Sequence, residues 1–479
     1  ALPGLRPAFC MAQKMGARLE WGQVLLRALP TFRRQAGQFA GGCMSPVIFW
    51  FRNDLRLHNQ PALHAALAQG SRHLLPVLCL PDAASPTPWG FARIGPHRRA
   101  RLVSAIHGLR QALQQCGCPL LVCPGPAASV LPALAGAVGA SEVLCEAIAA
   151  PSYEQAEENA LRAAGLAVHT IWQSSLLELA KLPFSVQQLP PVFTPFRHAV
   201  EQAGLQPPTP LPPPTSLPPW PQGVPAACLD GQDDALAAFA GPPPVADARS
   251  AFPYQRPPLH GGEAAALAHL AQYLARGLPH SYKRTRNGLM GLDYSSKWSP
   301  WLATGALSAR QALAQLRAYE AAQGASDGSY WLWFELLWRD YFRFLHLHHG
   351  RALYRAQGLG PARATPHDAG RFAAWCAGQT GQPLVDAGMR ELAATGYLSN
   401  RLRQVTASYL IHDLQCDWRA GAAWFENHLL DYDVYSNQGN WLYIAGRGTD
   451  PRGGRRFDPV QQAQTYDPHG AYQDLWSHP

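Results

Sequence analysis

The chain has 479 residues, enough for two or three domains, and its 47% hydrophobic and 15% charged residues exclude a disordered or collagen-like protein. The formal net charge of +8 favours an anionic partner such as nucleic acid, although many basic proteins bind none. No apolar stretch reaches about 18 residues, so no transmembrane helix is expected. The ten cysteines lack the spacing of a zinc or thioredoxin-like motif, which predicts a reducing compartment.

The first 43 residues form a basic leader with six Lys or Arg side chains and a single acid, Glu20. A transit peptide for an organelle has this composition. The alternative is that Met44 is the true start, because an apolar strand begins almost immediately, at residues 47–51. We favour the second interpretation, which predicts a cytoplasmic bacterial protein.

Short apolar runs then alternate with helical stretches rich in Ala and Leu as far as about residue 172. The runs occupy residues 47–51, 74–80, 120–123, 142–145 and 168–172. Alternation of strand and helix predicts a parallel sheet with helices on both faces and right-handed crossovers. We therefore expect a Rossmann-like α/β domain over residues 44–175.

Prolines are concentrated in the next segment, residues 176–260, which we interpret as an interdomain connector. Proline fixes φ and lacks an N–H group, so this segment cannot be regular helix or central strand. From residue 261 to 479 the pattern is helical and rich in Trp, which predicts an all-α domain. The stretch 330–342 is apolar around most of its circumference, as expected for a buried helix.

Two carboxylates, Asp431 and Asp433, stand in a largely apolar part of the helical half. A buried unpaired charge is heavily penalised, so both need partners, and Arg401 and Arg403 are the candidate donors. A metal site is the alternative, but no histidine stands at ligand spacing beside these acids, and we expect no metal.

Three histidines, His346, His348 and His349, also lack a zinc-type spacing. We interpret them as surface histidines.

Three motifs are distinctive: FRNDLRLHN at 51–59, TGYLSNR at 395–401 and DYDVYSNQGNW at 431–441. The first resembles the first strand and turn of the photolyase and cryptochrome family, and the other two resemble its flavin-site signatures. Within the family, SYKRTRNG at 281–288 and ELLWRDYF at 335–342 most resemble the DASH-type cryptochromes. The resemblance covers nearly everything after Ser45 except the connector.

This resemblance implies an FAD folded into a U within the helical domain. It also implies phosphate contacts from a hydroxyl-rich cradle and one cation, which supply donors to an anion. The positions implied are Tyr282, Ser295, Ser296, Lys297 and Ser299. For the serine cluster alone, a plain turn or helix N-cap is the alternative interpretation.

Beside the isoalloxazine, the resemblance implies a carboxylate, Asp431, paired with Arg403. It makes Asp433 a contact to the polar edge of the flavin and Asn437 the residue that faces N5. An amide there can bond to a neutral or reduced flavin without imposing a charge, which favours photolyase-like redox chemistry.

Trp441 and Trp418 resemble the first two members of the tryptophan chain that photoreduces FAD, with packing as the alternative role. The third member is expected about ten residues before Trp375, where this chain has Thr365. The usual electron route to the surface is therefore in doubt, and another aromatic residue can substitute.

For the substrate, Glu335 resembles the carboxyl group that bonds to the base edges of a pyrimidine dimer, and Trp338 the platform on which the lesion stacks. Asn400 is expected at the base edge. Gln404 and Tyr443 stand where ordinary dimer photolyases have Met and Trp. Both are DASH-like and favour single-stranded DNA, from which a lesion need not be extruded.

Further contacts to DNA are expected from arginines: Arg401, Arg447, Arg452, Arg455 and Arg456. An ordinary solvated basic loop is the alternative for the last four. In the N-terminal domain, Glu154 is the candidate carboxylate for a folate antenna, 5,10-methenyltetrahydrofolate, although an acid near a helix N-terminus needs no ligand.

Three functions stay open at this point. The first is a light-driven lyase, a monomer that repairs dimers in single-stranded DNA. The second is a blue-light signalling receptor, and the third a flavoprotein that binds nucleic acid without repair.

Overall fold

The computed structural model describes residues 45–68, 70, 72–149, 151–361, 366–449 and 453–478. The leader at 1–43, Thr365 and Arg452 lie outside the described residues. Within the described ranges, no helix is both long and apolar enough to cross a membrane.

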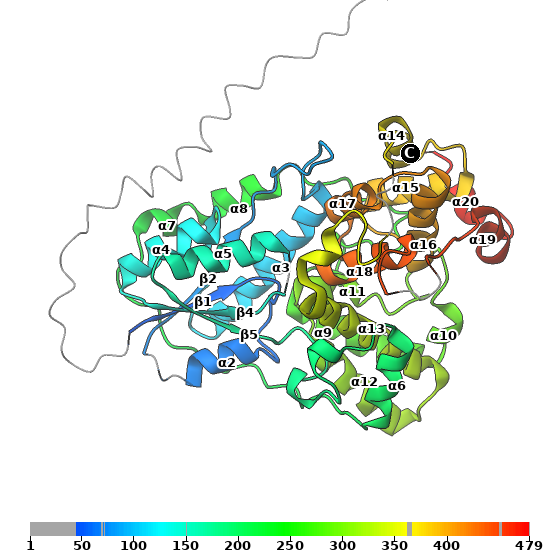
Figure 1. Ribbon diagram of the computed structural model, residues 1–479. Helices are drawn as coiled ribbons and strands as arrows, with labels where there is room; N and C mark the ends of the chain where they lie inside the picture. Colours follow the sequence, from blue (N-terminus) through cyan, green and yellow to red (C-terminus); the bar gives the residue numbers. More distant parts are fainter. Residues whose placement is uncertain are drawn as a thin grey trace, which may run out of the picture.

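The N-terminal part is a five-stranded parallel sheet in the order β3-β2-β1-β4-β5 (Figure 1). The strands are β1 (Val47–Phe51), β2 (Leu74–Leu80), β3 (Leu121–Pro124), β4 (Glu142–Glu146) and β5 (Ala167–Ile171). Their connecting helices are α2 (Pro61–Ala68), α3 (Pro96–Gln115), α4 (Ala127–Val138) and α5 (Ser152–Ala163). The predicted parallel α/β domain is confirmed, and each predicted strand lies within a residue or two of its observed bounds.

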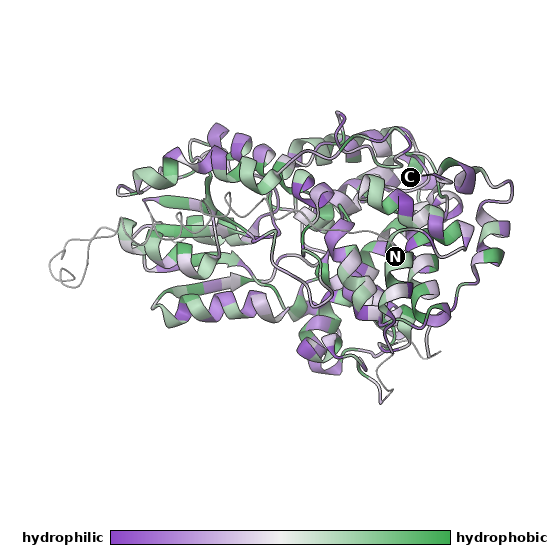
Figure 2. Ribbon diagram, turned by 90° about the horizontal axis from the view of Figure 1, so that it is seen from above, coloured by the Kyte–Doolittle hydropathy of each residue, from purple (hydrophilic) through white to green (hydrophobic). Residues whose placement is uncertain are grey.

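Helices cover both faces of this sheet because the central strand β1 is apolar at every position. Val47, Phe49 and Phe51 pack with α2 and α3, whereas Ile48 and Trp50 pack with α4. Successive side chains of a strand point to opposite faces, so a continuous apolar run needs cover on both. In Figure 2 the strands are accordingly coloured as hydrophobic.

The proline-rich connector follows the surface of both domains and includes short helices. They are η1 (Leu179–Lys181), η2 (Val186–Gln188), α6 (Phe193–Gln202), α7 (Ala226–Asp230) and α8 (Gln232–Ala240). Helix α6 packs in the helical half through Phe193 and Phe196, and α8 packs on α3 and β3. Between them, residues 205–219 have no regular structure, as proline predicts, and their backbone bonds to the N-terminal domain at Asn59, Leu74 and Cys116.

The C-terminal half is helical, as predicted. Its elements before the chain reaches residue 366 are α9 (Glu263–Ala275), η3 (Leu278–His280), α10 (Tyr282–Thr285), α11 (Ser299–Thr304), α12 (Ala309–Gln323), α13 (Asp327–His349) and η4 (Gly350–Tyr354). They are followed by α14 (Ala369–Cys376), α15 (Pro383–Thr395), α16 (Asn400–Ser408), η5 (Tyr409–Asp413), α17 (Trp418–His428), α18 (Val434–Ala445), α19 (Pro459–Tyr466) and α20 (Ala471–Leu475).

Helix α13 is the predicted buried helix, and it begins with a capping box between Ser326 and Ser329. The expectation of surface histidines was wrong at its end. His346 is buried, its Nδ1 lies 2.7 Å from the Phe342 carbonyl, and burial lowers its pKa to about 4. The apolar stripe of α13 continues through this position, so the helix face rather than the residue type decided burial.

The turn after β1 joins the two domains. Leu57 and His58 donate their backbone N–H groups to the Glu263 carboxylate at the start of α9, at 2.7 and 2.9 Å. Arg56 donates to the carbonyl of Gly305, 3.0 Å away. Gly305 has a φ of +72°, and a Cβ atom added to it would overlap the Asn53 carbonyl. Residues 51–59 therefore hold the two domains together.

Glu391 offers a test of the helical core. It is buried on α15 and accepts a hydrogen bond of 2.6 Å from the Tyr472 hydroxyl on α20. Burial raises its pKa from 4.5 to about 7. The native state then holds a proton that the unfolded chain has lost, so the free energy of unfolding should fall by ~3 kcal/mol as pH rises between these values.

Glu391→Gln should flatten this decline, measured by denaturant unfolding at a series of pH values. Glu201→Gln, at an exposed position, is the matched control and should leave the decline in the free energy of unfolding unchanged. An unchanged decline in Glu391→Gln would show that another group is responsible.

Candidate functional site

Seven of the residues expected at the flavin or the lesion line one cleft of about 80 Å³. They are Asn400, Arg403, Gln404, Asp431, Asp433, Asn437 and Trp441. They come from α16, from α18 and from the loop that joins α17 to α18, and we call this cleft the flavin cleft. Segments about 30 residues apart in sequence thus meet around one space.

Local signals explain why these segments take this shape. Gly396, with φ +68°, ends α15, and the Ser399 side chain caps α16 by accepting from Leu402 N. The Asp433 carboxylate caps α18 by accepting from Ser436 N at 2.8 Å. Both signature motifs are therefore helix starts that aim polar residues at the same cleft.

Asp431 is paired with Arg403, as expected, through an Oδ2 to Nη2 contact of 2.9 Å. Its other oxygen, Oδ1, is buried and has no hydrogen-bond partner among the described residues. A buried acceptor without a donor is costly. This oxygen fits a ligand that brings an N–H group into the cleft, as a flavin ring does.

Arg401 does not pair with either carboxylate, which corrects the expectation that both arginines are donors. It donates to Asn287 Oδ1 at 3.0 Å, and its guanidinium lies 4.7 Å from the Tyr466 ring centre. Residues two apart on a helix point in different directions, so Arg401 and Arg403 cannot serve the same site.

The partner of Asp433 is Arg343 on α13, which sequence reasoning missed. Although burial opposes ionisation, Arg343 and then Arg339 hold the pKa of Asp433 well below its usual range. A signal existed, because two arginines one turn apart on a buried helix also need counter-charges.

The Asn437 side chain is oriented by α17, since its Nδ2 donates to the Ala422 carbonyl at 3.1 Å. This bond uses one of the two Nδ2 hydrogens, so the side-chain oxygen and the second N–H can meet a ligand. Trp441 is buried, with its ring 5.1 Å from Phe425 and 6.4 Å from Trp375 between centroids. Trp418 is also buried, and its Nε1 donates to the Ala356 carbonyl at 3.0 Å.

The expected phosphate contacts form a second group outside the lining of the flavin cleft. Lys297 is buried, with Nζ 3.2 Å from the Tyr397 hydroxyl and 3.5 Å from the Tyr294 ring centre. It has no ion pair with a carboxylate among the described residues, and burial lowers its pKa. A buried ammonium in this state fits an anionic ligand. Tyr397 also lies 5.7 Å from the Arg403 guanidinium and so links the two groups.

The other members of that group differ in exposure. Tyr282 is buried at the first position of α10, Ser295 and Ser296 are half-buried, and Ser299 is exposed at the first position of α11. The hydroxyl-rich segment therefore runs from the protein interior to its surface.

Glu335 and Trp338 lie on one side of α13, each with a partner that sequence reasoning missed. Glu335 is paired with Arg286, whose guanidinium lies 4.3 Å from the Trp331 ring centre. Desolvation raises the pKa of Glu335, and Arg286 counteracts this. Trp338 stacks on Phe193 of the connector, at 3.7 Å and 11°. One face of the Trp338 ring is thus covered.

Tyr443 lies beside these residues, with its ring 5.9 Å from Trp338 and its hydroxyl bonded to Arg455. Arg456 is paired with Asp413 at 2.6 Å on the surface. Arg447 follows α18, and its carbonyl accepts a bond from Leu359 N.

Glu154 lines a larger cavity of about 540 Å³ between the domains, which we call the outer cavity. It lies at the carboxyl ends of β1, β2 and β3, where ligands bind in open α/β sheets. Glu154 is not an isolated acid there, because it shares the buried Arg52 with Glu158.

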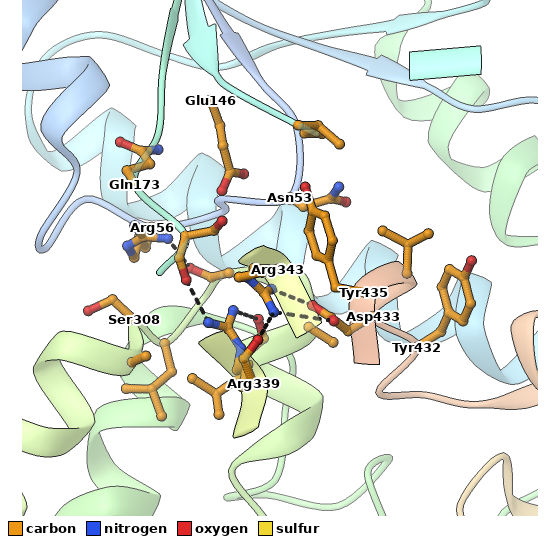
Figure 3. A pocket seen from close by; sticks show the side chains of 18 of the residues that line it. Asn53, Arg56, Glu146, Gln173, Ser308, Arg339, Arg343, Tyr432, Asp433 and Tyr435 are labelled. Carbon is orange, nitrogen blue, oxygen red and sulfur yellow. Dashed lines mark hydrogen bonds and ion pairs between the residues drawn. The ribbon is translucent and has the colours of Figure 1, made fainter. Parts of the chain in front are cut away.

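Figure 3 shows a polar pocket, whose volume is about 70 Å³. It shares Glu154 with the outer cavity and Asp433 with the flavin cleft. Glu146 and Gln173 reach into it from the N-terminal domain, opposite Arg339 and Arg343 of α13. Tyr432 lines all three spaces. Among the described residues, no cluster of three or more His, Cys, Asp or Glu side chains is placed to hold a metal ion.

The Arg403–Asp431 pair generates a stability prediction. Arg403→Ala should leave Asp431 charged in a buried site and lower the free energy of unfolding by about 3–5 kcal/mol. Arg419→Ala, which breaks the more exposed pair with Asp417, is the matched control and should cost under ~1 kcal/mol. Equal losses in the two variants would refute a special role for the buried pair.

Comparison with known proteins agrees with this geometry. A family model described as DNA photolyase matches residues 47–215, and one described as FAD binding domain of DNA photolyase matches residues 331–477. The protein named Cryptochrome DASH of Gloeobacter violaceus is 43% identical over 90% of this chain and 85% of its own length. That of Xenopus laevis is 41% identical over 90% of this chain and 82% of its own.

Solved structures give the same result. A Synechocystis cryptochrome matches with a TM-score of 0.83 and 40% identity, over 90% of this chain and 88% of that one. A class III photolyase of Agrobacterium tumefaciens matches with a TM-score of 0.74 and 29% identity, over 92% and 87%. The chain therefore belongs to the photolyase and cryptochrome family, among its DASH-type cryptochromes.

Proposed function

We propose that this protein is a blue-light-dependent FAD flavoprotein that binds cyclobutane pyrimidine dimers, preferentially in single-stranded DNA, and splits them by electron transfer from reduced FAD. The observation that carries the proposal is the flavin cleft. It combines the Asp431–Arg403 pair, a buried acceptor without a donor, the Asn437 amide and the Trp441 ring in one place.

The residues present fit FAD. Asp431 Oδ1 would accept from the flavin ring, Asn437 would meet its central edge, and Lys297 with the neighbouring hydroxyls would neutralise the pyrophosphate. When bound, FAD supplies light absorption and the electron for the reaction. The protein's own contribution would be to hold a charged pair and an amide in fixed positions beside the flavin ring.

Glu335 would act on the lesion by donating a hydrogen bond to a base carbonyl as negative charge develops there. A carboxyl group can donate only if it keeps its proton. Desolvation of Glu335 favours the proton and the ion pair with Arg286 opposes it, so this role requires the lesion to displace Arg286 from the carboxyl group. A contact that strengthens as charge develops favours the reaction rather than binding alone. Trp338 would stack on the lesion with the ring face that Phe193 leaves uncovered.

A preference for single strands is supported by Gln404 and Tyr443. Gln404 lines the flavin cleft, and the Tyr443 hydroxyl is bonded to Arg455. Both are more polar than the Met and Trp expected in ordinary dimer photolyases, and so are less able to fill the gap that a flipped base leaves in a duplex. An unpaired lesion avoids that cost.

We also propose that the outer cavity takes a folate antenna, 5,10-methenyltetrahydrofolate. Its volume of about 540 Å³ suits a small-molecule ligand. Glu154 and Tyr153 line it, and Arg93 lies 4.4 Å from the Tyr153 ring centre.

The first test is cofactor uptake. Purified protein should be yellow, with one FAD per chain, and Asp431→Ala together with Arg403→Ala should lose flavin while keeping the fold, because the double change removes the pair without leaving an unpaired charge. Absorbance after gel filtration and circular dichroism measure the two properties. Folded wild-type protein that takes up no FAD would contradict the proposal.

The second test is repair of a defined dimer under blue light. Wild type should act on single-stranded oligonucleotides in preference to duplex. Glu335→Ala should lower the repair yield per photon more than it weakens binding, whereas Trp338→Ala should mainly weaken binding, by about 1–3 kcal/mol. Glu335→Gln, which keeps a hydrogen-bond donor, is the matched control and should retain more yield than Glu335→Ala.

Intact single-stranded dimers after illumination of wild-type protein with fully reduced FAD would exclude the lyase. The blue-light receptor would then be the better assignment.

A further inference from the structure

Among the tryptophans of the described residues, the one whose ring contacts Trp441 is Trp375 of α14, and not Trp418. The Trp441 and Trp375 centroids are 6.4 Å apart at 76°, an edge-to-face contact. In the described part of the chain, Trp418 makes no ring contact with Trp441. Electron transfer weakens steeply with separation, so Trp375 is well placed to return an electron to Trp441.

Aromatic contacts continue from Trp375 to the surface. Phe372 lies 6.0 Å from Trp375 and 6.4 Å from Trp424 on α17. Phe425, the neighbour of Trp424 in sequence, also contacts both Trp441 and Trp375, at 5.1 and 6.1 Å. Trp375 is fully buried whereas Trp424 is half-buried, so the series leads outward from α14 to α17.

Trp89 is the competing exit, through His367 at 4.8 Å. The Arg419 guanidinium lies 6.0 Å from the Trp89 ring centre, and a positive charge there opposes formation of a second one on the indole. Among the described residues, no cation is stacked on Trp424. Its neighbour His428, 4.2 Å away, is neutral near pH 7, because burial lowers the pKa to about 4.

We propose that Trp375 and Trp424 form the electron route that supplies Trp441 in this protein. The route takes the place of the branch from Trp418, whose expected third member is Thr365 in this chain. The inference rests on the proposed FAD chemistry. Phe372 and Phe425 bridge the gap without being oxidised, because a phenyl ring is harder to oxidise than an indole.

Trp441 gives one electron to the light-excited flavin, Trp375 returns one to Trp441, and Trp424 returns one to Trp375. A thiol in solution then reduces oxidised Trp424, releases a proton and becomes a thiyl radical. After two such rounds the flavin has gained two electrons and the two thiyl radicals have joined as one disulfide. The net result is a reduced flavin and an oxidised thiol, with every tryptophan restored.

The experiment compares single Trp→Phe variants, each first shown to hold FAD. Under blue light with a thiol, the absorbance of oxidised flavin should fall about tenfold more slowly in Trp375→Phe and Trp424→Phe than in wild type. A tenfold slower rate corresponds to an activation barrier higher by about 1.4 kcal/mol. The loss of this absorbance should be slowed less in Trp418→Phe. Trp89→Phe is the matched control and should be reduced at the wild-type rate.

A second measurement needs no variant. Wild-type protein illuminated without thiol should accumulate oxidised tryptophan in the peptide that contains Trp424, measured by mass spectrometry. The inference would be overturned if Trp375→Phe and Trp424→Phe were photoreduced at the wild-type rate. It would also be overturned if Trp89 were the oxidised residue and Trp89→Phe the slowed variant. Wild-type protein without bound flavin would instead contradict the proposed function, so the two failures are distinguishable.

Discussion

The pairing of buried charge at Asp433 is the interaction on which the site depends. Its carboxylate caps α18 through Ser436 N, pairs with Arg343 of α13, and lines both the flavin cleft and the polar pocket between the domains. A buried carboxylate must have such partners, and meeting this demand fixes α18 against α13. The capped end of α18 in turn sets the positions of Asn437 and Trp441 one and two turns later.

Close approach of helices completes this arrangement. A Cβ at Gly439 of α18 would overlap the Phe342 ring of α13, and a Cβ at Gly421 of α17 would overlap the Trp441 ring. Glycine at these two positions lets three helices meet around the cleft. The Trp441 ring is thereby confined between Phe425 and Trp375, the contacts on which the proposed electron route is built.

The two domains meet over polar as well as apolar surfaces, since Ile148 and Phe91 pack with side chains of the helical half. The turn after β1 bonds to Glu263 and Gly305, and Glu146 faces Arg339 and Arg343 across the polar pocket. Burial raises the pKa of Glu146, one of whose oxygens has no hydrogen-bond partner among the described residues. A small polar space with such groups is suited to ordered water. This pocket lies between the outer cavity and the flavin cleft, and its lining residues come from both domains.

The sequence by itself determined the fold class, the parallel sheet and the buried helix α13, because periodicity, proline content and helix caps are local properties. Its motifs at 51–59, 395–401 and 431–441 indicated the family by resemblance. It also indicated that Asp431 and Asp433 need partners. The Arg403 partner of Asp431 was expected, whereas only the tertiary structure decided the partners of Asp433, Glu335 and Trp338. These partners, Arg343, Arg286 and Phe193, lie 90, 49 and 145 residues away in sequence. The same reason explains the errors at Arg401 and His346. The side of a helix on which a residue lies follows from sequence spacing, whereas long-range packing decides which other element contacts that side.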